Sequence, residues 1–250
     1  MLNEERKLLI LKEVNEKGTI TVQDLRDKYG VSESTIRRAI TDLSREGKLV
    51  KVFGGAVALD NSNNIEEPPL HSKDAVNKDE KIKIAEYAAS LIDPGDYVFI
   101  DSGSTTRYMI DYITEKRAIY ITNSVSHARG MVRRGFKVLL TGGELKENTE
   151  VIVGADAILH IQKYHFAKGF FGTNGINTKL GFTTPDVREA LVKRVAIENT
   201  EPGNRFILAD HDKFGKSSAV TFSDFGGTLV ITDKRPENAY MNMMEIKVVY

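Results

Sequence analysis

Residues 32–47 read SESTIRRAITDLSREG, and this stretch predicts one amphipathic helix around which the N-terminal part of the chain is organised. Ser32 is a favourable N-cap, because its hydroxyl can accept a hydrogen bond from a first-turn amide. Gly47 is the expected stop, because glycine readily takes the left-handed conformation that ends many helices. The apolar side chains between them recur at i, i+4 and i+7 and are Ile36, Ile40 and Leu43. We expect this stripe to be the buried face of the helix.

The opposite face of the same helix combines hydroxyl groups with guanidinium groups. Its residues follow the spacing i, i+3, i+4, i+7 and i+11 and are Ser34, Arg37, Arg38, Thr41 and Arg45, with Thr35 beside them in the first turn. A helix that presents serine, threonine and arginine from its N-terminal half is suited to read bases in a DNA major groove. An ordinary amphipathic surface helix would also carry arginines on its exposed side. The sequence on either side of the helix decides between these two interpretations.

Two further helices are predicted upstream. Residues 3–17 form the first, which stops at Gly18 and whose expected core face consists of Leu8, Leu11 and Val14, with Ile10 beside them. Thr21 caps the second, residues 22–29, which ends at Gly30. A short turn then leads into the helix described above. Two helices joined by a tight turn form the helix-turn-helix unit of many DNA-binding proteins.

A short β-hairpin is predicted directly after these helices. The run KLVKVFGGAVAL, residues 48–59, places two β-rich segments around the glycine pair at 54–55. Lys48 and Lys51 lie on this hairpin, where we expect them to contact DNA phosphates rather than bases. Three helices followed by such a wing predict a winged helix-turn-helix domain over residues 1–58, with operator DNA as its partner.

The amount of charge adds little to this interpretation, whereas its position supports it. The chain carries 35 lysines and arginines against 35 aspartates and glutamates, so its formal net charge is zero. Residues 1–58 hold 11 basic against 9 acidic side chains. A chain this balanced is not expected to be a general polyanion binder.

The composition excludes several other classes of protein. The 250 residues are 41% hydrophobic and 28% charged, ordinary values for a globular protein with a sizeable core. The absence of cysteine excludes disulfide scaffolds, thiolate metal sites and cysteine nucleophiles. No apolar run reaches the roughly 18 residues that a membrane span needs, and the start MLNEERK is not a signal peptide. We therefore expect a cytoplasmic protein with no membrane partner.

The stretch TIRRAITDLSREGKLVKVFGGA, residues 35–56, resembles the N-terminal signature of the DeoR-type bacterial transcription regulators. That signature reads approximately T-[IV]-R-R-D-L-x-x-L-x-x-x-G-x-L-x-[KR]-x-H-G-G-A. This chain departs from it at Ala39, where the family usually has aspartate, and at Phe53, where it usually has histidine. The resemblance extends over nearly the whole chain. It implies a repressor of a carbohydrate-utilisation operon that is controlled by a phosphorylated sugar.

A polar segment divides the remaining sequence. Residues 59–72 include Pro68 and Pro69, and this composition favours an extended linker. Residues 73–250 then alternate strand and helix patterns, which predicts a mostly parallel α/β domain for effector binding. The expected strands cover 97–100, 118–122, 136–141, 166–172, 205–209, 228–232 and 246–250, and the expected helices cover 73–92, 105–116, 125–134, 155–163 and 186–199. In such domains ligands bind at the carboxyl ends of the strands.

The clearest candidate for a ligand site is the segment DSGSTT, which joins the first of these strands to a helix. Its residues are Asp101, Ser102, Gly103, Ser104, Thr105 and Thr106. Glycine lets backbone amides approach an anion, the hydroxyls add donors, and the following helix adds positive partial charge at its N-terminus. A merely well-capped turn would need fewer hydroxyls, so we favour a phosphate site. The loop is neither a Walker motif nor GxGxxG, so nucleotide hydrolysis is not expected.

Polar residues also follow other predicted strands. They include Asn123, Gly142, Gly143, Gly172, Asn174 and Gly175, which we expect to belong to the same pocket. The C-terminal domain resembles the DeoR-type effector domain, whose fold is similar to those of ribose-5-phosphate isomerases and CoA transferases. The resemblance implies that the DSGSTT loop holds a sugar phosphate. It matches TPDVREALVKR to a family motif that contains Glu189 and Lys193. It also matches LADHDKFG to one with Asp210 and Lys213 near the sugar, where Asp212 replaces the usual serine.

An enzyme is the alternative that the resemblance in fold leaves open. A sugar-phosphate isomerase with an accessory DNA-binding module would need a general base and an acid beside the sugar carbonyl. Isomerases of the similar fold carry a DGAD-like carboxylate pair, whereas the equivalent stretch here is FGTN, residues 171–174. The histidines show no metal-ligand spacing. We therefore expect no catalysis, metal or cofactor, and a homo-oligomer, dimer or tetramer, that pairs two DNA-binding domains on one operator.

Overall fold

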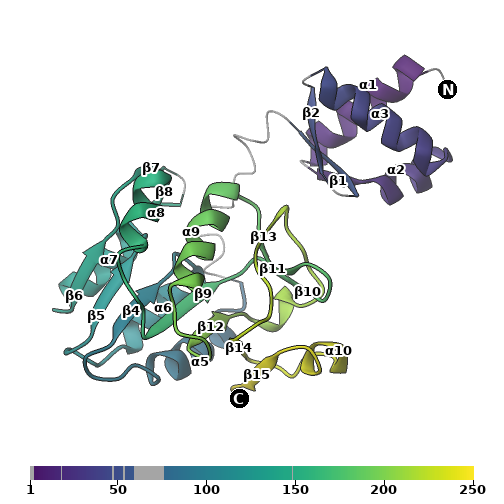
Figure 1. Ribbon diagram of the computed structural model, residues 1–250. Helices are drawn as coiled ribbons and strands as arrows, with labels where there is room; N and C mark the ends of the chain where they lie inside the picture. The colour runs from purple at the N-terminus through teal and green to yellow at the C-terminus, as the bar shows by residue number, and fades with distance from the viewer. Residues whose placement is uncertain (1–2, 18, 47, 53, 59–75, 148) are drawn as a thin grey trace. The chain divides into compact units, whose positions relative to one another are not determined.

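A computed structural model describes residues 3–17, 19–46, 48–52, 54–58, 76–147 and 149–250 of the chain (Figure 1). The chain divides into two compact units, unit 1 from Met1 to Glu67 and unit 2 from Pro68 to Tyr250. The linker predicted over 59–72 lies outside the described residues. Among the helices that the structure describes, none combines the length and apolar character needed to cross a bilayer.

Unit 1 combines helices with a small antiparallel sheet. Its elements are α1 (Asn3–Lys17), α2 (Val22–Tyr29), α3 (Glu33–Arg45), β1 (Thr19–Thr21), β2 (Leu49–Val52) and β3 (Gly55–Ala58). The sheet has the order β1-β3-β2, so β3 pairs with both neighbours. The predicted helix-turn-helix is confirmed, and a hairpin follows it as expected. Strand β1 is an addition to the predicted elements, because so short a segment carries little periodicity.

Capping hydrogen bonds fix where α2 and α3 begin. Thr21 Oγ1 accepts a hydrogen bond from Asp24 N at 3.0 Å as part of a capping box. Ser32 Oγ accepts one from Thr35 N at 3.3 Å, which confirms Ser32 as the predicted N-cap of α3. These bonds satisfy amides that have no partner inside their own helices.

The C-terminal end of α3 is reached at Arg45, with Glu46 as a C-cap in a right-handed conformation. The predicted glycine stop at Gly47 and the family departure at Phe53 both lie outside the described residues.

The predicted stripe of α3 lies at the centre of the core of unit 1. Ile36, Ile40 and Leu43 are 0%, 1% and 2% exposed, and they share a cluster with Leu25 of α2 and Leu49 of β2. Burial of a side chain of this size contributes about 1.5–3 kcal/mol to stability. The amphipathic character of α3 is therefore the main reason why this short unit folds around it.

Helix α1 buries a different face from the one predicted. Ile10 and Val14 are 0% exposed, whereas Leu8 is 68% exposed. Two residues correspond to about 200° around an α-helix, so Leu8 and Ile10 cannot face the same core. The prediction for Leu8 is wrong, because the run LLIL places an apolar residue on every side of the helix.

Unit 2 is built on a seven-stranded parallel sheet (Figure 1). The strands in spatial order are β15 (Glu245–Val248), β14 (Thr228–Thr232), β12 (Arg205–Leu208), β9 (Lys168–Gly172), β4 (Tyr97–Ile100), β5 (Ile119–Thr122) and β6 (Lys137–Leu140). Every pair of neighbours in this sheet is parallel. The predicted mostly parallel α/β domain is confirmed.

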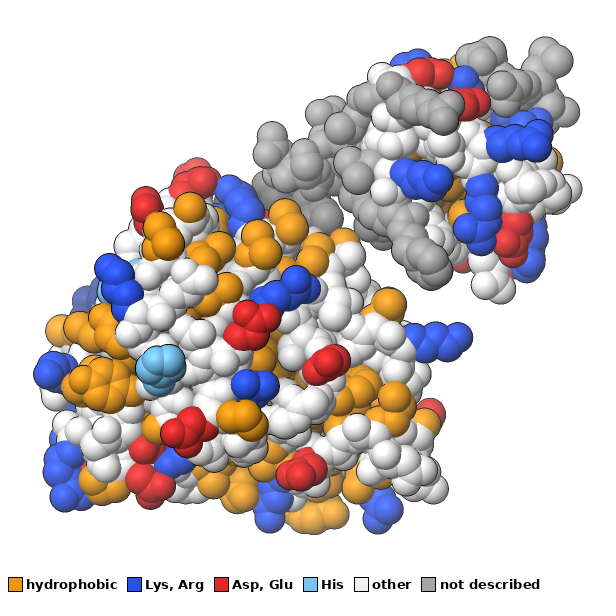
Figure 2. Space-filling view, in the orientation of Figure 1, with side chains coloured by type: hydrophobic (Ala, Val, Ile, Leu, Met, Phe, Trp, Pro, Cys, Tyr) orange, Lys and Arg blue, Asp and Glu red, His pale blue; other side chains and the backbone are white. Residues whose placement is uncertain are grey.

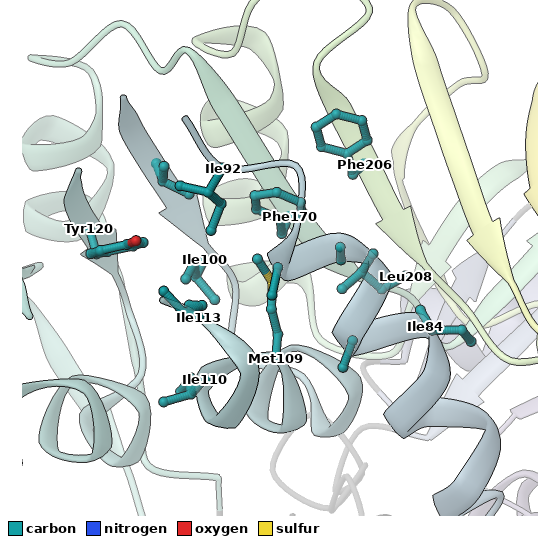
Figure 3. Packing of buried hydrophobic residues seen from close by; sticks show 14 of the residues in the cluster. Ile84, Ile92, Ile100, Met109, Ile110, Ile113, Tyr120, Phe170, Phe206 and Leu208 are labelled. Carbon is teal, nitrogen blue, oxygen red and sulfur yellow. The ribbon is translucent and has the colours of Figure 1, made fainter. Parts of the chain in front are cut away.

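Helices cover both faces of this sheet. One face carries α5 (Lys78–Ala89), α6 (Ser104–Tyr112) and α7 (Val125–Arg133). The other face carries α8 (Ala155–Ile161) and α9 (Val187–Glu198). Ile84 of α5, Met109 of α6 and Phe170 of β9 lie together in the first of the two cores (Figure 3). Strands buried on both sides need apolar residues at every position, which is why YVFI reads as an unbroken apolar run.

Smaller elements surround the main sheet. They are β7 (Glu144–Lys146), β8 (Val151–Val153), β10 (Gly175–Asn177), β11 (Gly181–Thr184), β13 (Val220–Ser223), the 3₁₀ helix η2 (His211–Lys213) and α10 (Asn238–Met241). Strands β7 and β8 form a hairpin, and β10, β11 and β13 form a separate antiparallel sheet. These elements are absent from the sequence-based prediction, because such short segments have no clear period.

The helices of unit 2 differ from their predicted bounds by one to five residues, and the two largest differences are in α5 and α6. The helix predicted over 105–116 ends at Tyr112, because Ile113 adopts extended backbone angles of φ −63° and ψ 129°. The helix predicted over 73–92 covers Lys78–Ala89, and residues 73–75 lie outside the described part of the chain.

The strand order of the main sheet reverses between β4 and β9. From β4 the chain proceeds outward through β5 and β6, and from β9 it proceeds in the other direction through β12, β14 and β15. In open α/β sheets, ligands bind at such a reversal, just beyond the carboxyl ends of the strands. Asp101 directly follows β4, and Gly172 is the last residue of β9. These two predicted site residues therefore lie at the position where a ligand site is expected.

Candidate functional site

Helix α3 presents the polar face that its sequence predicts. The exposed side chains on this face include Ser34, Arg37 and Arg38, and the half-buried ones include Thr35 and Thr41. The backbone of Arg45 belongs to α3, but its side chain lies outside the described part of the structure. The exposed arginines have the reach and the donors needed to contact base edges.

The two central arginines of α3 differ in their surroundings. Arg37 Nη2 donates to Glu33 Oε2 at 3.2 Å, one turn earlier in the helix. Arg38 has no ion-pair partner among the residues that the structure describes. An exposed pair such as Arg37–Glu33 contributes at most about 1 kcal/mol, so DNA could displace it. Arg38 is nevertheless the side chain that can reach a base without first losing a contact.

Lys51 connects the β2–β3 hairpin to α3. Its Nζ donates to Thr41 Oγ1 at 3.0 Å, and Thr41 Oγ1 donates to the carbonyl oxygen of Arg37 at 2.7 Å. Lys48 Nζ lies 2.8 Å from Glu46 Oε2. Hydrogen bonds from lysine side chains, Lys48 first, lower the pKa of Glu46 to about 2. The contact with Thr41 places Lys51 beside the polar face of α3.

A buried ion pair lies at the reversal of the strand order. Lys193 of α9 pairs with Asp101 Oδ2, and the two side chains are 6% and 1% exposed. Asp101 Oδ2 also accepts a hydrogen bond from Gly172 N at 3.0 Å, and Lys193 Nζ donates to Gly172 O at 3.2 Å. Three of the predicted site residues, from β9, α9 and the end of β4, are therefore in direct contact.

The DSGSTT loop has an accessible part and a buried part. Ser102, Gly103 and Ser104 are half-buried, whereas Thr105 and Thr106 are 6% and 0% exposed. Gly103 is the N-cap of α6 and has no side chain to offer to the amides of the first turn. Those amides have no partner inside the helix and keep their capacity to bind an anion. Thr106 instead hydrogen-bonds to the backbone of the loop.

Thr106 holds the loop in its folded shape. Its Oγ1 accepts a hydrogen bond from Gly103 N at 2.7 Å and donates to Asp101 O at 2.6 Å. A Cβ atom on Gly103 would lie 3.5 Å from the Cα of Gly172. The tighter contact of such a Cβ atom would be with Thr106 Oγ1, at 3.2 Å, and the φ of −115° shows that Gly103 is not under backbone strain.

His127 of α7 supports this loop and is absent from the sequence-based site prediction. Its Nε2 lies 3.2 Å from Thr106 Oγ1, and its Nδ1 lies 2.8 Å from Ser124 Oγ. Because Thr106 gives its proton to a carbonyl, Nε2 is the donor of the ring and Nδ1 is the acceptor. Complete burial lowers the pKa of His127 to about 4, so the ring is neutral near pH 7.

A second group of carboxylates follows β12, the neighbour of β9. Asp210 is 1% exposed, and its Oδ1 accepts hydrogen bonds from Asn77 Nδ2 and from Asp212 N, each at 3.1 Å. Asn77 Nδ2 also donates to Asp212 Oδ2 at 2.9 Å. This hydrogen bond is the largest cause that lowers the pKa of Asp212. Lys213 is half-buried and forms no ion pair among the described residues.

Glu189 of α9 forms an ion pair with a lysine of the β7–β8 hairpin. Lys146 Nζ lies 2.6 Å from Glu189 Oε1 and 2.7 Å from Asp186 Oδ2. Hydrogen bonds and charge from Lys146 outweigh burial and lower the pKa of Asp186. Glu189 precedes Lys193 by four residues, so both side chains lie on one face of α9. The hairpin is therefore held at the turn of α9 that leads to the Asp101–Lys193 pair.

Two of the predicted glycines, Gly143 and Gly175, have structural explanations. Gly143 has a φ of 132°, and a Cβ atom there would lie 2.6 Å from Val153 O. A Cβ atom on Gly175 would lie 2.5 Å from Lys216 O. Gly142 is exposed and follows β6, the edge strand farthest from β9 on that side of the sheet. Only Gly172 among the predicted glycines beyond the DSGSTT loop contacts the ion pair.

Buried polar atoms without partners occur at the carboxyl ends of several strands. Among the described residues they include Asp101 Oδ1 after β4, Asn123 Oδ1 after β5, Thr141 Oγ1 after β6 and Thr232 Oγ1 in β14. Leaving such atoms unsatisfied costs about 1–3 kcal/mol each. Two of them, on Asp101 and Asn123, are acceptors that a ligand hydroxyl would satisfy. Asn174, in contrast, is half-buried and accepts from Thr184 Oγ1 at 3.3 Å.

A groove of about 470 Å³ lies between α6 and α7. Its lining combines the cations Arg107, Arg129 and Arg133 with the anions Asp111, Glu147 and Glu150. Because these charges balance, the groove suits a phosphate less well than the N-terminus of α6. Within the described residues, no group of three or more histidine, aspartate or glutamate side chains is arranged to hold a metal ion.

Sequence motifs could not reveal the long-range contacts of the site. Asn77 and Asp210 are 133 positions apart, and Lys146 and Glu189 are 43 apart, so no local pattern joins them. His127 did carry a local signal, because it stands three residues after Ser124, the spacing of an N-cap.

Comparisons with known proteins cover both units. Residues 6–62 match the family model described as the DeoR-like helix-turn-helix domain, and residues 76–234 match the DeoR C terminal sensor domain. The chain belongs to the DeoR family. As a DeoR-family member it is a transcriptional regulator that binds DNA through its helix-turn-helix and carries a sensor domain.

Several curated proteins are similar to the chain over most of their own length. The chain is 38% identical to the uncharacterized HTH-type transcriptional regulator FruR of Bacillus subtilis, over 100% of this chain and 98% of that protein. It is 32% identical to the lactose phosphotransferase system repressor of Staphylococcus aureus, over 95% and 94% of the two chains. It is 33% identical to the putative aga operon transcriptional repressor of Escherichia coli O157:H7, over 86% and 80%. All three are named as regulators or repressors and not as enzymes.

Solved structures resemble the DeoR-type chain more distantly. Ribose 5 phosphate isomerase A from Neisseria gonorrhoeae has a TM-score of 0.41 and 17% identity, over 55% of this chain and 53% of that chain. Translation initiation factor eIF-2B from Pyrococcus horikoshii has a TM-score of 0.40 and 15% identity, over 84% and 68%. Similarities of this size say nothing about activity. The expected likeness to CoA transferases stays a prediction.

Proposed function

We propose that the chain is a repressor of a carbohydrate-utilisation operon and that a phosphorylated sugar controls its binding to operator DNA. The observation that carries the proposal is the position of the Asp101–Lys193 pair, beside the uncapped N-terminus of α6 and at the reversal of the strand order. An α/β sheet has its ligand site at this position.

The N-terminus of α6 supplies what a phosphate group needs. The hydroxyls of Ser102 and Ser104 are partly accessible, and the first-turn amides receive no side-chain cap. A helix N-terminus also carries about half a positive charge. Thr105 and Thr106 are not needed as ligands in this proposal, because they are buried and Thr106 already binds the backbone of the loop.

Oxygen acceptors at the ends of neighbouring strands and on α9 supply what the sugar needs. Asp101 Oδ1 and Asn123 Oδ1 are buried acceptors without a partner among the described residues. Asp210 follows the adjoining strand β12, and Glu189 lies on the same face of α9 as Lys193. A compound with several hydroxyl groups can donate to many acceptors at once, whereas an aliphatic phosphate could not. The names of two relatives, a lactose phosphotransferase system repressor and an aga operon repressor, support a sugar-related operon.

We expect specific binding to operator DNA to need the DNA-binding units of two copies of the chain. A single small DNA-binding module buries too little surface for a specific affinity of about 10⁻⁸ M or tighter, so we propose a dimer or tetramer. Hydrophobic side chains gather over β7 and α9 on one face of unit 2 (Figure 2). The exposed ones in these elements are Leu145, Val187 and Leu191, at 54%, 57% and 43%. Light scattering that shows a monomer both free and on operator DNA would contradict this part of the proposal.

A thermal-shift screen of the full chain tests the proposed ligand class. The probes are ribose-5-phosphate, glucose-6-phosphate and fructose-1-phosphate, with the unphosphorylated sugars and inorganic phosphate as controls. A ligand at 100 times its dissociation constant stabilises the folded state by about 2.7 kcal/mol, which a melting curve detects easily. We expect at least one sugar phosphate to raise the melting temperature more than its sugar does. If free sugars act as strongly as their phosphates, the phosphate site is wrong.

A further inference from the structure

Asn77 joins the start of α5 to two carboxylates that lie far away in the sequence. Its Nδ2 donates to Asp210 Oδ1 at 3.1 Å and to Asp212 Oδ2 at 2.9 Å. Asp212 stands where the family motif usually has serine, so the second of these bonds depends on a residue in which this chain departs from the pattern. Both N–H groups of the Asn77 amide are thus used on carboxylates.

The side chain of Asn77 does not cap α5. Asn77 occupies the N-cap position, yet its side chain forms no capping hydrogen bond, and its backbone is left-handed with φ 51° and ψ 45°. Few residues other than glycine adopt this conformation, and asparagine is one of those that tolerate it. The two bonds to Asp210 and Asp212 are therefore what this asparagine gains from its position.

Asn77 lies close in the chain to the segment that joins the two units. Asn77 is the second described residue of unit 2, and the segment before it, residues 59–75, is the covalent connection to the DNA-binding unit. A change in the backbone of Asn77 alters the start of α5, to which that segment is covalently joined. Such a change requires only that the two carboxylates release the amide.

The chemistry of the proposed ligand can provide that release. An amide NH₂ offers two donors to two neighbouring carboxylates, and two adjacent hydroxyls of a sugar offer the same pair of donors. Asp210 is 1% exposed, and its Oδ1 already accepts from both Asp212 N and Asn77 Nδ2, so a hydroxyl that binds this oxygen must replace one of these two donors. Sugar hydroxyls and Asn77 therefore compete for the same oxygens.

We propose that Asn77 is the positioning residue that reports occupation of the Asp210–Asp212 pair to the DNA-binding unit. In this proposal the sugar hydroxyls replace Asn77 on the carboxylates, Asn77 leaves its left-handed conformation, and operator affinity changes. The inference rests on the proposed function, because it assumes a sugar phosphate as the ligand. It adds the residue through which the ligand acts and assigns the regulatory role to the hydroxyls instead of to the phosphate.

The experiment compares two affinities of the full chain, each measured with and without the other ligand. Operator DNA is obtained by in vitro selection, and the probe is whichever of ribose-5-phosphate, glucose-6-phosphate and fructose-1-phosphate gives the largest thermal shift. In the wild type the probe should change operator affinity by roughly 5- to 150-fold, and operator should change probe affinity by the same factor. Inorganic phosphate should stabilise the chain yet leave operator affinity unchanged.

Asn77→Gly is the decisive variant, because glycine keeps the left-handed backbone accessible and removes only the amide. It should bind operator and probe, the probe at least as tightly as the wild type does, while the change in operator affinity falls to less than twofold. Asp212→Ser, which removes one acceptor and restores the family residue, should reduce the change in the same direction. Asn242→Gly removes an exposed asparagine at the C-cap of α10 and should respond like the wild type.

The outcomes separate this inference from the function on which it rests. If none of the three sugar phosphates binds the wild type or alters its operator affinity, the proposed function is wrong and the inference falls with it. If the wild type responds and both Asn77→Gly and Asp212→Ser respond equally well, only the role of Asn77 is wrong. Full regulation by inorganic phosphate alone would also overturn it, because phosphate carries no sugar hydroxyls.

Discussion

Lys193 and Asp101 form a buried ion pair across the point at which the strand order of the sheet reverses, although they are 92 positions apart in the chain. Both side chains also bind the backbone of Gly172 at the end of β9. Two strands and α9 therefore meet at this pair, which fixes the geometry of the proposed effector site. Each side chain depends on the other, because a buried charge without a partner is strongly destabilising.

Replacing Lys193 by methionine should lower the free energy of unfolding of unit 2 by about 3–5 kcal/mol, because Asp101 would remain buried without its cation. Urea denaturation followed by circular dichroism measures the change. Lys179→Met is the matched control, since this lysine is exposed, and it should change stability by less than about 0.5 kcal/mol. The double variant Lys193→Met with Asp101→Asn should recover part of the loss. Unchanged stability of Lys193→Met would show that the pair does not hold the site together.

The neutral state of His127 should make unit 2 sensitive to mild acid. The pKa of His127 is about 4 in the folded chain and 6.5 without burial, so the unfolded chain binds more protons between these values. The free energy of unfolding should therefore fall as pH is lowered from about 6.5 to about 4, by about 3 kcal/mol in total. Denaturation curves at pH 7, 5 and 4 measure this fall.

His127→Gln is the control for that titration, because glutamine cannot take up a proton and can still form hydrogen bonds to Thr106 and Ser124. Its stability should depend less on pH in this interval than that of the wild type. Equal pH dependence in both proteins would mean that other groups titrate there and that His127 is not the cause.

The fold could be predicted from the sequence wherever burial on both sides imposes a long pattern. The run YVFI is apolar because Val98, Phe99 and Ile100 of β4 are buried between two cores, one on each face of the sheet. The stripe Ile36, Ile40 and Leu43 repeats at helical spacing because α3 packs on one side. The same reasoning failed for Leu8, since an apolar run around a whole helix has no single buried side. It also failed for β7 and β8, which are too short to show a period.

The candidate site could be predicted only as a set of strand ends. The parallel arrangement implies that Asp101, Gly172 and Asp210 lie at one edge of the sheet, and the structure places them on neighbouring strands. Which of them are in contact depends on α9 and α5, whose positions are set by packing and not by local sequence. For this reason the partners Lys146 and Asn77 could not be found from motifs. The pattern of DSGSTT likewise did not reveal that Thr106 binds the loop backbone.

Arg38→Ala should weaken operator binding by about 1–3 kcal/mol and relax the preference at one base position, because Arg38 is exposed and has no ion-pair partner among the described residues. Lys51→Ala should instead weaken binding to all sequences alike and reduce the salt dependence by about one counterion. Fluorescence anisotropy at several salt concentrations, with the selected operator and a scrambled duplex, distinguishes the two effects. If Arg38→Ala binds the operator like the wild type, α3 does not read bases through this arginine.

The central claim is that a sugar phosphate binds at the N-terminus of α6 and thereby changes operator affinity. Its most direct test is an operator titration of Ser104→Asp with and without the sugar phosphate that stabilises the wild type. An aspartate at the first position of α6 favours the helix, because its charge complements the helix dipole, but it repels a phosphate at the same place. We expect Ser104→Asp to bind operator normally and not to respond to the sugar phosphate, while the neutral Ser104→Asn still responds. A Ser104→Asp variant that responds like the wild type would show that the phosphate binds elsewhere.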